Sequence, residues 1–147
     1  MPSLRDETVR RDLVQRLQAL TAAKKPKWGK LDAPRVLCHL SDALAMSVGQ
    51  ISVQPMNRKV FHHFPLKHLI IYVFPFPKGA PTAPELLSTA PQDFDTDQRR
   101  VVELIDRLAA APKAKGPEHP FFGLLTNEEW NVLQWKHIDH HLQQFGC

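Results

Sequence analysis

The chain has 147 residues, of which 43% are hydrophobic, and a formal net charge of +4 with histidine neutral. This composition excludes an intrinsically disordered chain, and the length suits a single globular domain over residues 1–147. The longest apolar run, Leu69 to Phe74, is far shorter than the ~20 residues that span a bilayer. We therefore expect no membrane partner.

Basic residues are concentrated in the first half of the chain. Residues 1–78 contain 13 Lys and Arg against 5 Asp and Glu, whereas residues 79–147 contain 6 against 10. The densest basic group consists of Lys24, Lys25, Lys27 and Lys30. We interpret this group as a solvated connector, so no nucleic-acid partner is expected, and DNA binding through it is the weakest functional hypothesis.

The two cysteines, Cys38 and Cys147, have neither the spacing of a metal-binding pair nor that of a disulfide framework. Such cysteine usage is typical of a reducing compartment. The N-terminal residues are charged and lack the apolar stretch of a signal peptide. These features predict a cytoplasmic location.

Apolar residues at helical intervals predict two helices in the first third of the chain. The first covers about residues 4–22, with Ser3 as its N-cap. The second covers about residues 33–49, where Asp32 is the expected N-cap and Pro34 suits the first turn.

Two more helices are expected in the last third. One covers about residues 96–111, and the other begins at Thr126, which forms a T-x-x-E capping box with Glu129 and is closed by Gly146. The Pro- and Gly-rich stretch 112–123 between them is interpreted as a loop.

The middle of the chain is less regular. Residues 64–74 fit a short buried helix or a strand, and we favour a helix because no partner strand is visible. Residues 75–91 are rich in proline and are interpreted as a long crossover. Four main helices with one long connection predict an all-α fold, a four-helix bundle with a proline-rich crossover.

The last predicted helix carries the most informative motif, because His137 and His141 are four residues apart and lie on one face. Neutral imidazole is a common metal ligand, and a catalytic site often uses three protein donors and leaves one position open. His39, on the second helix, is the expected third donor. We predict that His39, His137 and His141 form a metal site.

Three neighbouring residues leave alternatives open. His140 pairs with His137 at i+3, so an H-x-x-H pair is an alternative donor set. His119 lies in the P-E-H-P-F-F-G stretch and approaches the site only if that loop packs over the end of the bundle. Cys38 is expected to be a buried small hydrophobic residue. Asp42, three residues after His39, is a candidate to orient a ligand or to accept a proton.

These motifs resemble those of a known superfamily. The pairing of L-C-H-L-S-D-A-L around His39 with H-I-D-H-H near the end of the chain resembles the DinB-like superfamily of metalloenzymes. The stretches H-P-F-F-G-L-L-T-N-E-E-W and H-I-D-H-H-L-Q-Q-F-G look like a bacterial branch of it that is labelled as a domain of unknown function.

The resemblance implies a four-helix bundle with a long crossover and a homodimer. It also implies a divalent metal ion, usually nickel or zinc, held by His39, His137 and His141. Related members include transferases that use a low-molecular-weight thiol, and others are regarded as hydrolases.

Two main functional hypotheses remain from the sequence. The first is a metal-dependent enzyme that acts on a small molecule by thiol-dependent transfer or by hydrolysis. The second is a non-catalytic, metal-stabilised bundle that binds a small molecule or a protein partner.

Overall fold

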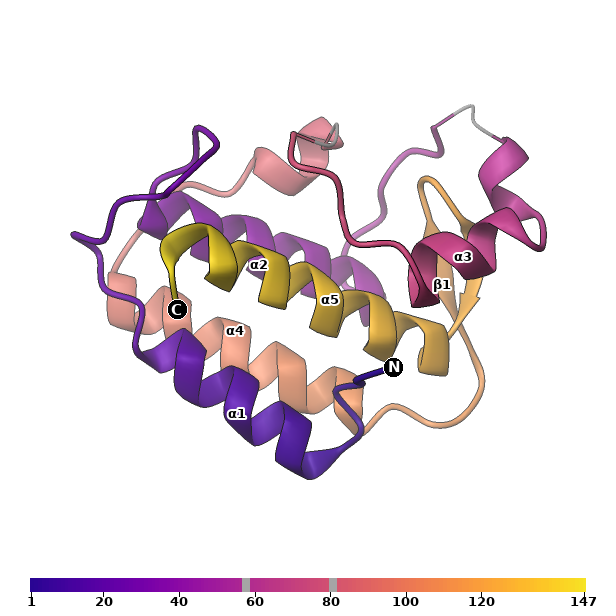
Figure 1. Cartoon of the computed structure of the whole chain (residues 1–147), viewed down its shortest axis with the longest axis horizontal. Coiled ribbons are helices and arrows are strands. Elements are labelled where there is room, and N and C mark those ends of the chain that lie inside the picture. Colours follow the sequence, from indigo (N-terminus) through magenta and orange to yellow (C-terminus); the bar gives the residue numbers. More distant parts are fainter. Residues whose placement is uncertain (57–58, 80–81) are drawn as a thin grey trace.

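The computed structural model describes residues 1–56, 59–79 and 82–147 (Figure 1). The described residues form five α-helices, two short 3-10 helices and one antiparallel pair of strands. In chain order the elements are α1 (Glu7–Gln18), α2 (Ala33–Ser47), η1 (Lys59–His62), α3 (Leu66–Tyr72), η2 (Pro84–Leu87), α4 (Phe94–Ala109), β1 (Lys115–His119), β2 (Gly123–Thr126) and α5 (Asn127–Phe145). None of the described helices has the length and apolar content needed to cross a bilayer.

The prediction of an all-α four-helix bundle is wrong, because β1 and β2 make the fold mixed α/β (Figure 1). Residues 112–123, interpreted above as a loop, contain β1 and lead into β2. Pro117 lies in β1 at an irregularity of the register between Lys115 and Glu118, where a missing N–H is tolerated. No alternation of apolar and polar residues signals these short strands in the sequence.

The hairpin is held by its contacts with α5 and the core. The Trp130 indole N–H donates to the main-chain oxygen of Pro117 over 2.9 Å. Phe122 and Leu125 are buried in the main hydrophobic cluster. An isolated two-stranded hairpin is marginally stable in water, so this packing is what keeps the strands paired.

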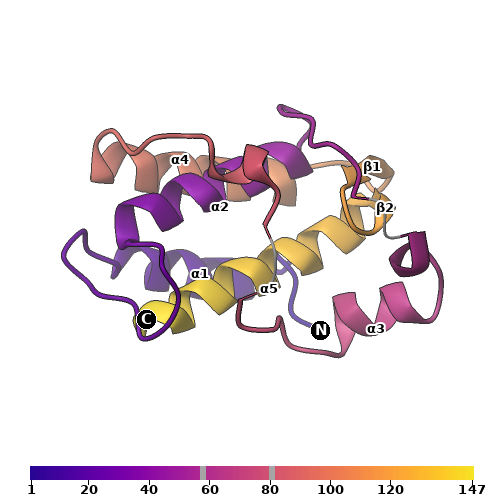
Figure 2. The ribbon, with the colours of Figure 1, turned by 90° about the horizontal axis from the view of Figure 1, so that it is seen from above.

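The four long helices α1, α2, α4 and α5 surround the hydrophobic core. Helix α2 packs against both α4 and α5, and α1 packs against α4 and α5. The largest fully buried side chains include Trp130 and Phe145 of α5, Leu37 and Leu40 of α2, and Ile105 of α4. Figures 1 and 2 show α2 and α5 running in opposite directions.

The helix boundaries follow the capping residues closely, with one exception. Asp32 accepts a hydrogen bond from the Arg35 N–H at the start of α2, as predicted. The α5 capping box is also confirmed, and Gly146 ends that helix with φ +71°. Helix α1, however, is capped by Asp6 rather than Ser3, because the Asp6 carboxylate accepts from the N–H groups of two first-turn residues.

The segment between α2 and α4 covers one side of this framework. The preference for a helix within residues 64–74 is confirmed by α3, which is shorter than predicted and packs against α5 (Figure 2). Later in the crossover, η2 packs against α2. Residues 80 and 81 of the predicted crossover lie outside the described residues.

The capping box gives a direct test of the α5 start. Replacing Thr126 with alanine removes the side-chain acceptor of the Glu129 N–H, and we expect the free energy of unfolding to fall by about 1 kcal/mol. Thr8→Ala, at an exposed first-turn position of α1, is the matched control and should change it by less than about 0.5 kcal/mol. Urea unfolding measures both, and equal values would contradict the capping role.

Candidate metal centre

The opposite directions of α2 and α5 bring the first half of α2 beside the second half of α5 (Figure 1). His39 of α2 thereby meets His137 and His141 of α5. The ring centroids of His39 lie 4.9 Å from His137 and 5.0 Å from His141, and those of His137 and His141 lie 4.9 Å apart. The three imidazoles form a nearly equilateral triangle.

Hydrogen bonds fix which nitrogen of His39 faces the other two rings. Its Nδ1 lies 2.9 Å from the main-chain oxygen of Leu86 in η2, and a carbonyl can only accept, so Nδ1 carries the proton. The Nε2 of neutral His39 therefore keeps its lone pair. This Nε2 lies 3.0 Å from Nε2 of His137. Without an ion, the proton between these two nitrogens would be on Nε2 of His137; to bind an ion there, His137 would carry its proton on Nδ1 instead.

His141 is oriented in the same way by a side chain of its own helix. Its Nδ1 lies 2.8 Å from Oε1 of Gln144, which lets Nδ1–H donate to the amide oxygen and leaves Nε2 free. The Gln144 amide nitrogen in turn donates to the main-chain oxygen of Trp28. Two of the three rings thus have their Nδ1 occupied by carbonyl oxygens. In metal sites such partners set the tautomer and raise ligand basicity.

A glycine lets the loop before α2 approach this amide. Gly29 has φ +83°, and a Cβ built there would lie 2.3 Å from Nε2 of Gln144. Any other residue would be strained at that φ and would collide with the amide. The Trp28 carbonyl can therefore reach Gln144 because glycine follows it.

His39 is buried and His137 and His141 are half-buried, and the resulting loss of hydration keeps all three imidazoles neutral. It lowers the pKa of His39, lowers that of His137 well below its usual value, and lowers that of His141 to about 3. The neighbouring histidines add to the effect on His137 and His141, because positive charges so close would repel. Neutral His39 and His141 therefore offer Nε2 lone pairs at neutral pH, and neutral His137 needs only to move its proton to Nδ1 to do the same.

The donor set fits a divalent cation. One ligand atom from each of His39, His137 and His141 can be chosen so that all lie within 4.8 Å of one another. Two nitrogens bound tetrahedrally to zinc at ~2.0–2.1 Å lie roughly 3.3 Å apart, close to the 3.0 Å between His39 and His137. The three-histidine group can thus hold a metal ion. That it does so in the protein stays a prediction.

Asp42 does not orient His39, because Nδ1–H of His39 donates to the Leu86 carbonyl instead. Asp42 is 8% exposed; its Oδ1 accepts from the Thr89 hydroxyl over 2.6 Å, and its Oδ2 has no partner among the described residues. The proton-accepting role of Asp42 stays a prediction.

Cys38 is buried as expected, and it is not poised as a nucleophile. Burial, and next the nearby carboxylate of Asp97, raise the pKa of its thiol to about 11. The thiolate that a nucleophilic role needs is therefore scarce at neutral pH.

His140 lies outside the triangle. Its ring faces Trp28 and Phe76, with centroids 6.1 and 6.2 Å away. The structure therefore brings the H-x-x-x-H pair together with His39, rather than the alternative H-x-x-H pair. His119 packs on Phe122 and Trp130, with centroids 4.7 and 5.2 Å away.

Sequence reasoning missed the groups that orient the histidines. Leu86 and Trp28 act through their main-chain oxygens, and every residue type has such an oxygen, so the sequence gives no signal for them. Gln144 had a weak signal, because it lies three residues after His141 on the same helix and so on nearly the same face.

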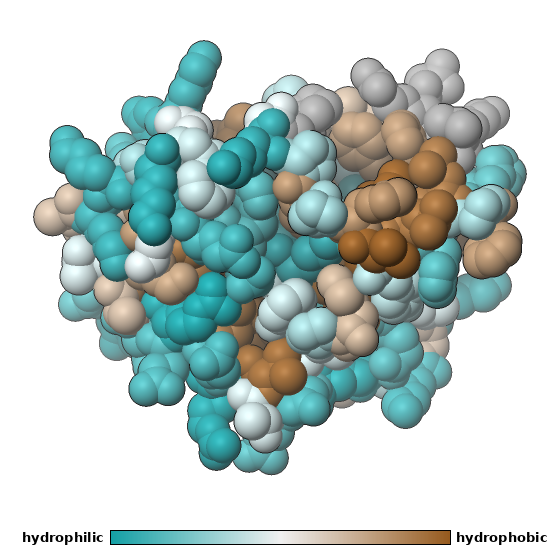
Figure 3. All heavy atoms as spheres, viewed as in Figure 1, coloured by the Kyte–Doolittle hydropathy of each residue, from teal (hydrophilic) through white to brown (hydrophobic). Residues whose placement is uncertain are grey.

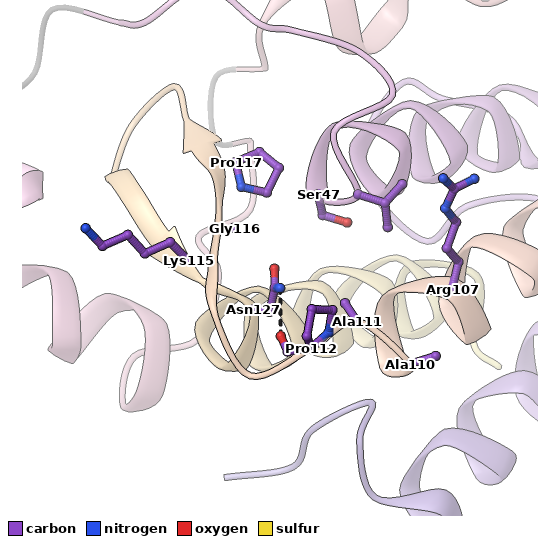
Figure 4. Close-up of a pocket in the computed structure, with 10 residues that line it drawn as sticks. Ser47, Arg107, Ala110, Ala111, Pro112, Lys115, Gly116, Pro117 and Asn127 are labelled. Atoms are coloured by element: carbon purple, nitrogen blue, oxygen red, sulfur yellow. Dashed lines mark hydrogen bonds between the residues drawn. The ribbon is translucent and has the colours of Figure 1, made fainter.

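A cavity of about 560 Å³ lies away from the histidines and is lined by the ends of α2 and α4 and by β1 (Figure 4). Its two cations do not converge, because Lys115 points away from Arg107 and the other lining residues. None of the predicted site residues lines this cavity.

The comparisons with known proteins give a family. A family model described as "Protein of unknown function (DUF1569)" matches residues 6–146. The chain belongs to this family. No curated protein and no solved structure gave a significant match. The matched range contains all three histidines together with Gln144, Leu86 and Trp28, so the whole candidate centre belongs to the family domain.

His119 provides a pH test of the fold beside this centre. Its Nδ1 accepts from the N–H groups of Phe121 and Phe122 over 3.0 and 3.3 Å, and burial lowers its pKa to about 3. In the unfolded chain the same ring takes up its proton near the usual value of 6.5. The unfolded state therefore binds more protons between these values, and stability rises with pH across that window.

Replacing His119 with asparagine keeps an acceptor near Nδ1 and removes the titrating ring. We expect the gain in unfolding free energy from pH 3 to 6.5 to become shallower, by at most about 1.4 kcal/mol per pH unit. The measurement is the urea midpoint across this window, with the exposed His63→Asn as control. An unchanged slope in His119→Asn would show that the ring does not titrate as described.

Proposed function

We propose that the protein is a metal-dependent enzyme whose divalent ion is bound by His39, His137 and His141. The observation that carries this proposal is the convergence of three neutral imidazoles, two of which have Nδ1 fixed by carbonyl oxygens. Three protein donors leave a coordination position for water or substrate.

The chain's own residues would orient the ligands and move a proton. Leu86 and Gln144 hold His39 and His141 with Nε2 toward the centre, and the Trp28 carbonyl keeps the Gln144 amide from rotating. The Oδ2 of Asp42, buried and without a partner among the described residues, is the proposed proton acceptor. When bound, the ion would supply Lewis-acid chemistry that lowers the pKa of a coordinated water or thiol.

The reaction class follows from the resemblance to the DinB-like superfamily. On that basis we propose nickel or zinc as the ion and a small molecule as the substrate. Thiol-dependent transfer and hydrolysis are both compatible with one open position, since each needs only an activated nucleophile beside the substrate.

One observation also favours a non-catalytic role. The ligands come from α2 and α5, about 100 residues apart in the chain, so a bound ion would cross-link the two helices. Such a cross-link stabilises the fold whether or not a reaction takes place.

The direct test compares the metal content of purified protein, prepared without chelator, with that of two variants. His137→Ala removes a central donor and should lose the bound ion, whereas His140→Ala lies outside the triangle and should retain it. Mass spectrometry of the metals gives the stoichiometry. Equal content in the protein and His137→Ala would refute the site, and loss in both variants would favour the H-x-x-H pair of His137 and His140.

Activity then separates the enzyme from the metal-stabilised fold. Turnover of an electrophile only when a low-molecular-weight thiol is added identifies transfer, and turnover of an ester without thiol identifies hydrolysis. If chelation lowers the melting temperature but neither substrate is turned over, the non-catalytic role is supported.

Gln144 offers a second, finer test. Gln144→Leu removes the acceptor of the His141 Nδ1–H, and we expect zinc affinity to fall about 10–100-fold, as for other outer partners of metal ligands. Gln143→Leu changes the exposed neighbour of the same type and should leave affinity unchanged. Competition with a chromogenic chelator measures both constants. Equal affinities would show that Gln144 does not orient His141.

A further inference from the structure

A second cavity lies beside the histidine centre, on the side of the crossover. It has a volume of about 250 Å³ and is lined by residues of α5, by the segment that follows α3 and by Met1. Phe76 and His140 both line it. The same Phe76 ring lies edge-on to His137, with centroids 5.9 Å apart. Phe76 therefore stands between this pocket and a predicted metal ligand.

The charged groups that line the pocket are already engaged within the protein. The Lys136 ammonium donates to the main-chain oxygens of Ile70 and Ile71. The Asp139 carboxylate pairs with Arg16 at 2.8 Å and accepts from the Gln143 amide. A polar ligand would have to compete with these partners, whereas an apolar one would lose nothing.

The rim of the pocket is apolar and exposed. Val73 is 58% exposed and Phe74 51% exposed, although both are large hydrophobic residues. Figure 3 shows apolar side chains gathered where α3 ends and the crossover begins. Exposed apolar side chains around a hollow are typical of a site that buries them on binding.

The Phe76 ring is held by cation–π and aromatic contacts and not by hydrogen bonds. Rotation of the ring can replace these contacts with others. The Lys136 ammonium lies 5.2 Å from its centroid, and the rings of His137 and His140 meet it edge to face. Contacts of these kinds are individually weak. A ring so held can turn aside when a ligand replaces its contacts.

We infer that this pocket is the subsite for an apolar group of the substrate, a single aryl ring or a short alkyl chain, and that Phe76 gates the passage from it to the three histidines. A cavity of about 150 Å³ with apolar walls accommodates benzene, so this one has room for a substituted ring. The gate rests on the proposed function, whereas the pocket can be tested without any metal.

The pocket is tested with toluene as the probe and benzenesulfonate as its charged counterpart. In heteronuclear NMR spectra of the full chain, toluene should give saturable shifts of the backbone amides of Trp135, Asp139 and Gln143. Benzenesulfonate should give none at the same concentrations. No shift with toluene, or equal shifts with both probes, would overturn the assignment of an apolar subsite.

The gate is tested on zinc-loaded protein by uptake and by release to a chromogenic chelator. In Phe76→Ala both rates should rise several-fold with an unchanged dissociation constant, because a gate changes access and not affinity. Phe76→Leu should lie between the two, and Phe64→Ala, at a site 82% exposed just before α3, should match the unmodified protein.

The possible failures can be told apart. Unchanged rates in Phe76→Ala, or faster release with an equal loss of affinity, would overturn the gate and make Phe76 a packing residue only. If the unmodified protein binds no zinc, the proposed function fails and the gate with it. The toluene titration then decides the pocket by itself.

Discussion

The hydrogen bonds from the Nδ1 atoms of His39 and His141 to carbonyl oxygens are the interactions on which the rest of the site depends. An imidazole enclosed in a protein must lose its charge, and its remaining N–H must find an acceptor. Once both conditions are met through Nδ1, the lone pair on Nε2 is left facing the other rings. Two rings arranged in this way, with neutral His137 as the third, form a favourable place for a cation and a poor one for a proton.

These bonds depend on segments outside the helices. The Leu86 carbonyl comes from the short η2 turn, and the Trp28 carbonyl comes from the loop before α2, where Gly29 permits the close approach. The helices set the positions of the rings, and the irregular segments set their tautomers. The proline-rich crossover contributes to the site through η2, where the Leu86 carbonyl accepts a hydrogen bond from the buried His39.

The sequence was sufficient for the four long helices and for the pairing of His137 with His141, because both are encoded by local spacing. Asp32, Thr126 and Gly146 mark helix ends through their own backbone chemistry. The hairpin could not be predicted, since its strands are short, contain Pro117 and depend on a bond from Trp130 that forms only in the folded chain. The Leu86 contact could not be predicted either, because a main-chain oxygen is the same in every residue. Helical spacing placed Asp42 near His39, but the Leu86 carbonyl accepts from Nδ1 of His39 instead, so only the proton-accepting part of the Asp42 prediction stays open.

The burial that prepares these histidines for a metal ion also limits what can reach them. Neutral, partly buried imidazoles have few water molecules around them. Each aromatic side chain that excludes water from the centre also narrows the path by which a substrate reaches the three histidines. Because His137 and His141 are only half-buried, the helices alone do not close the centre. Phe76 can control the route from the second pocket, because it contacts His137 and lines that pocket at the same time. Its contacts are replaceable ones, unlike the fixed hydrogen bonds of Gln144 on another side of the centre. A purely structural metal site needs only histidines held by fixed hydrogen bonds. A catalytic site also needs a side chain that can move to admit a substrate, and Phe76 is that side chain in our proposal.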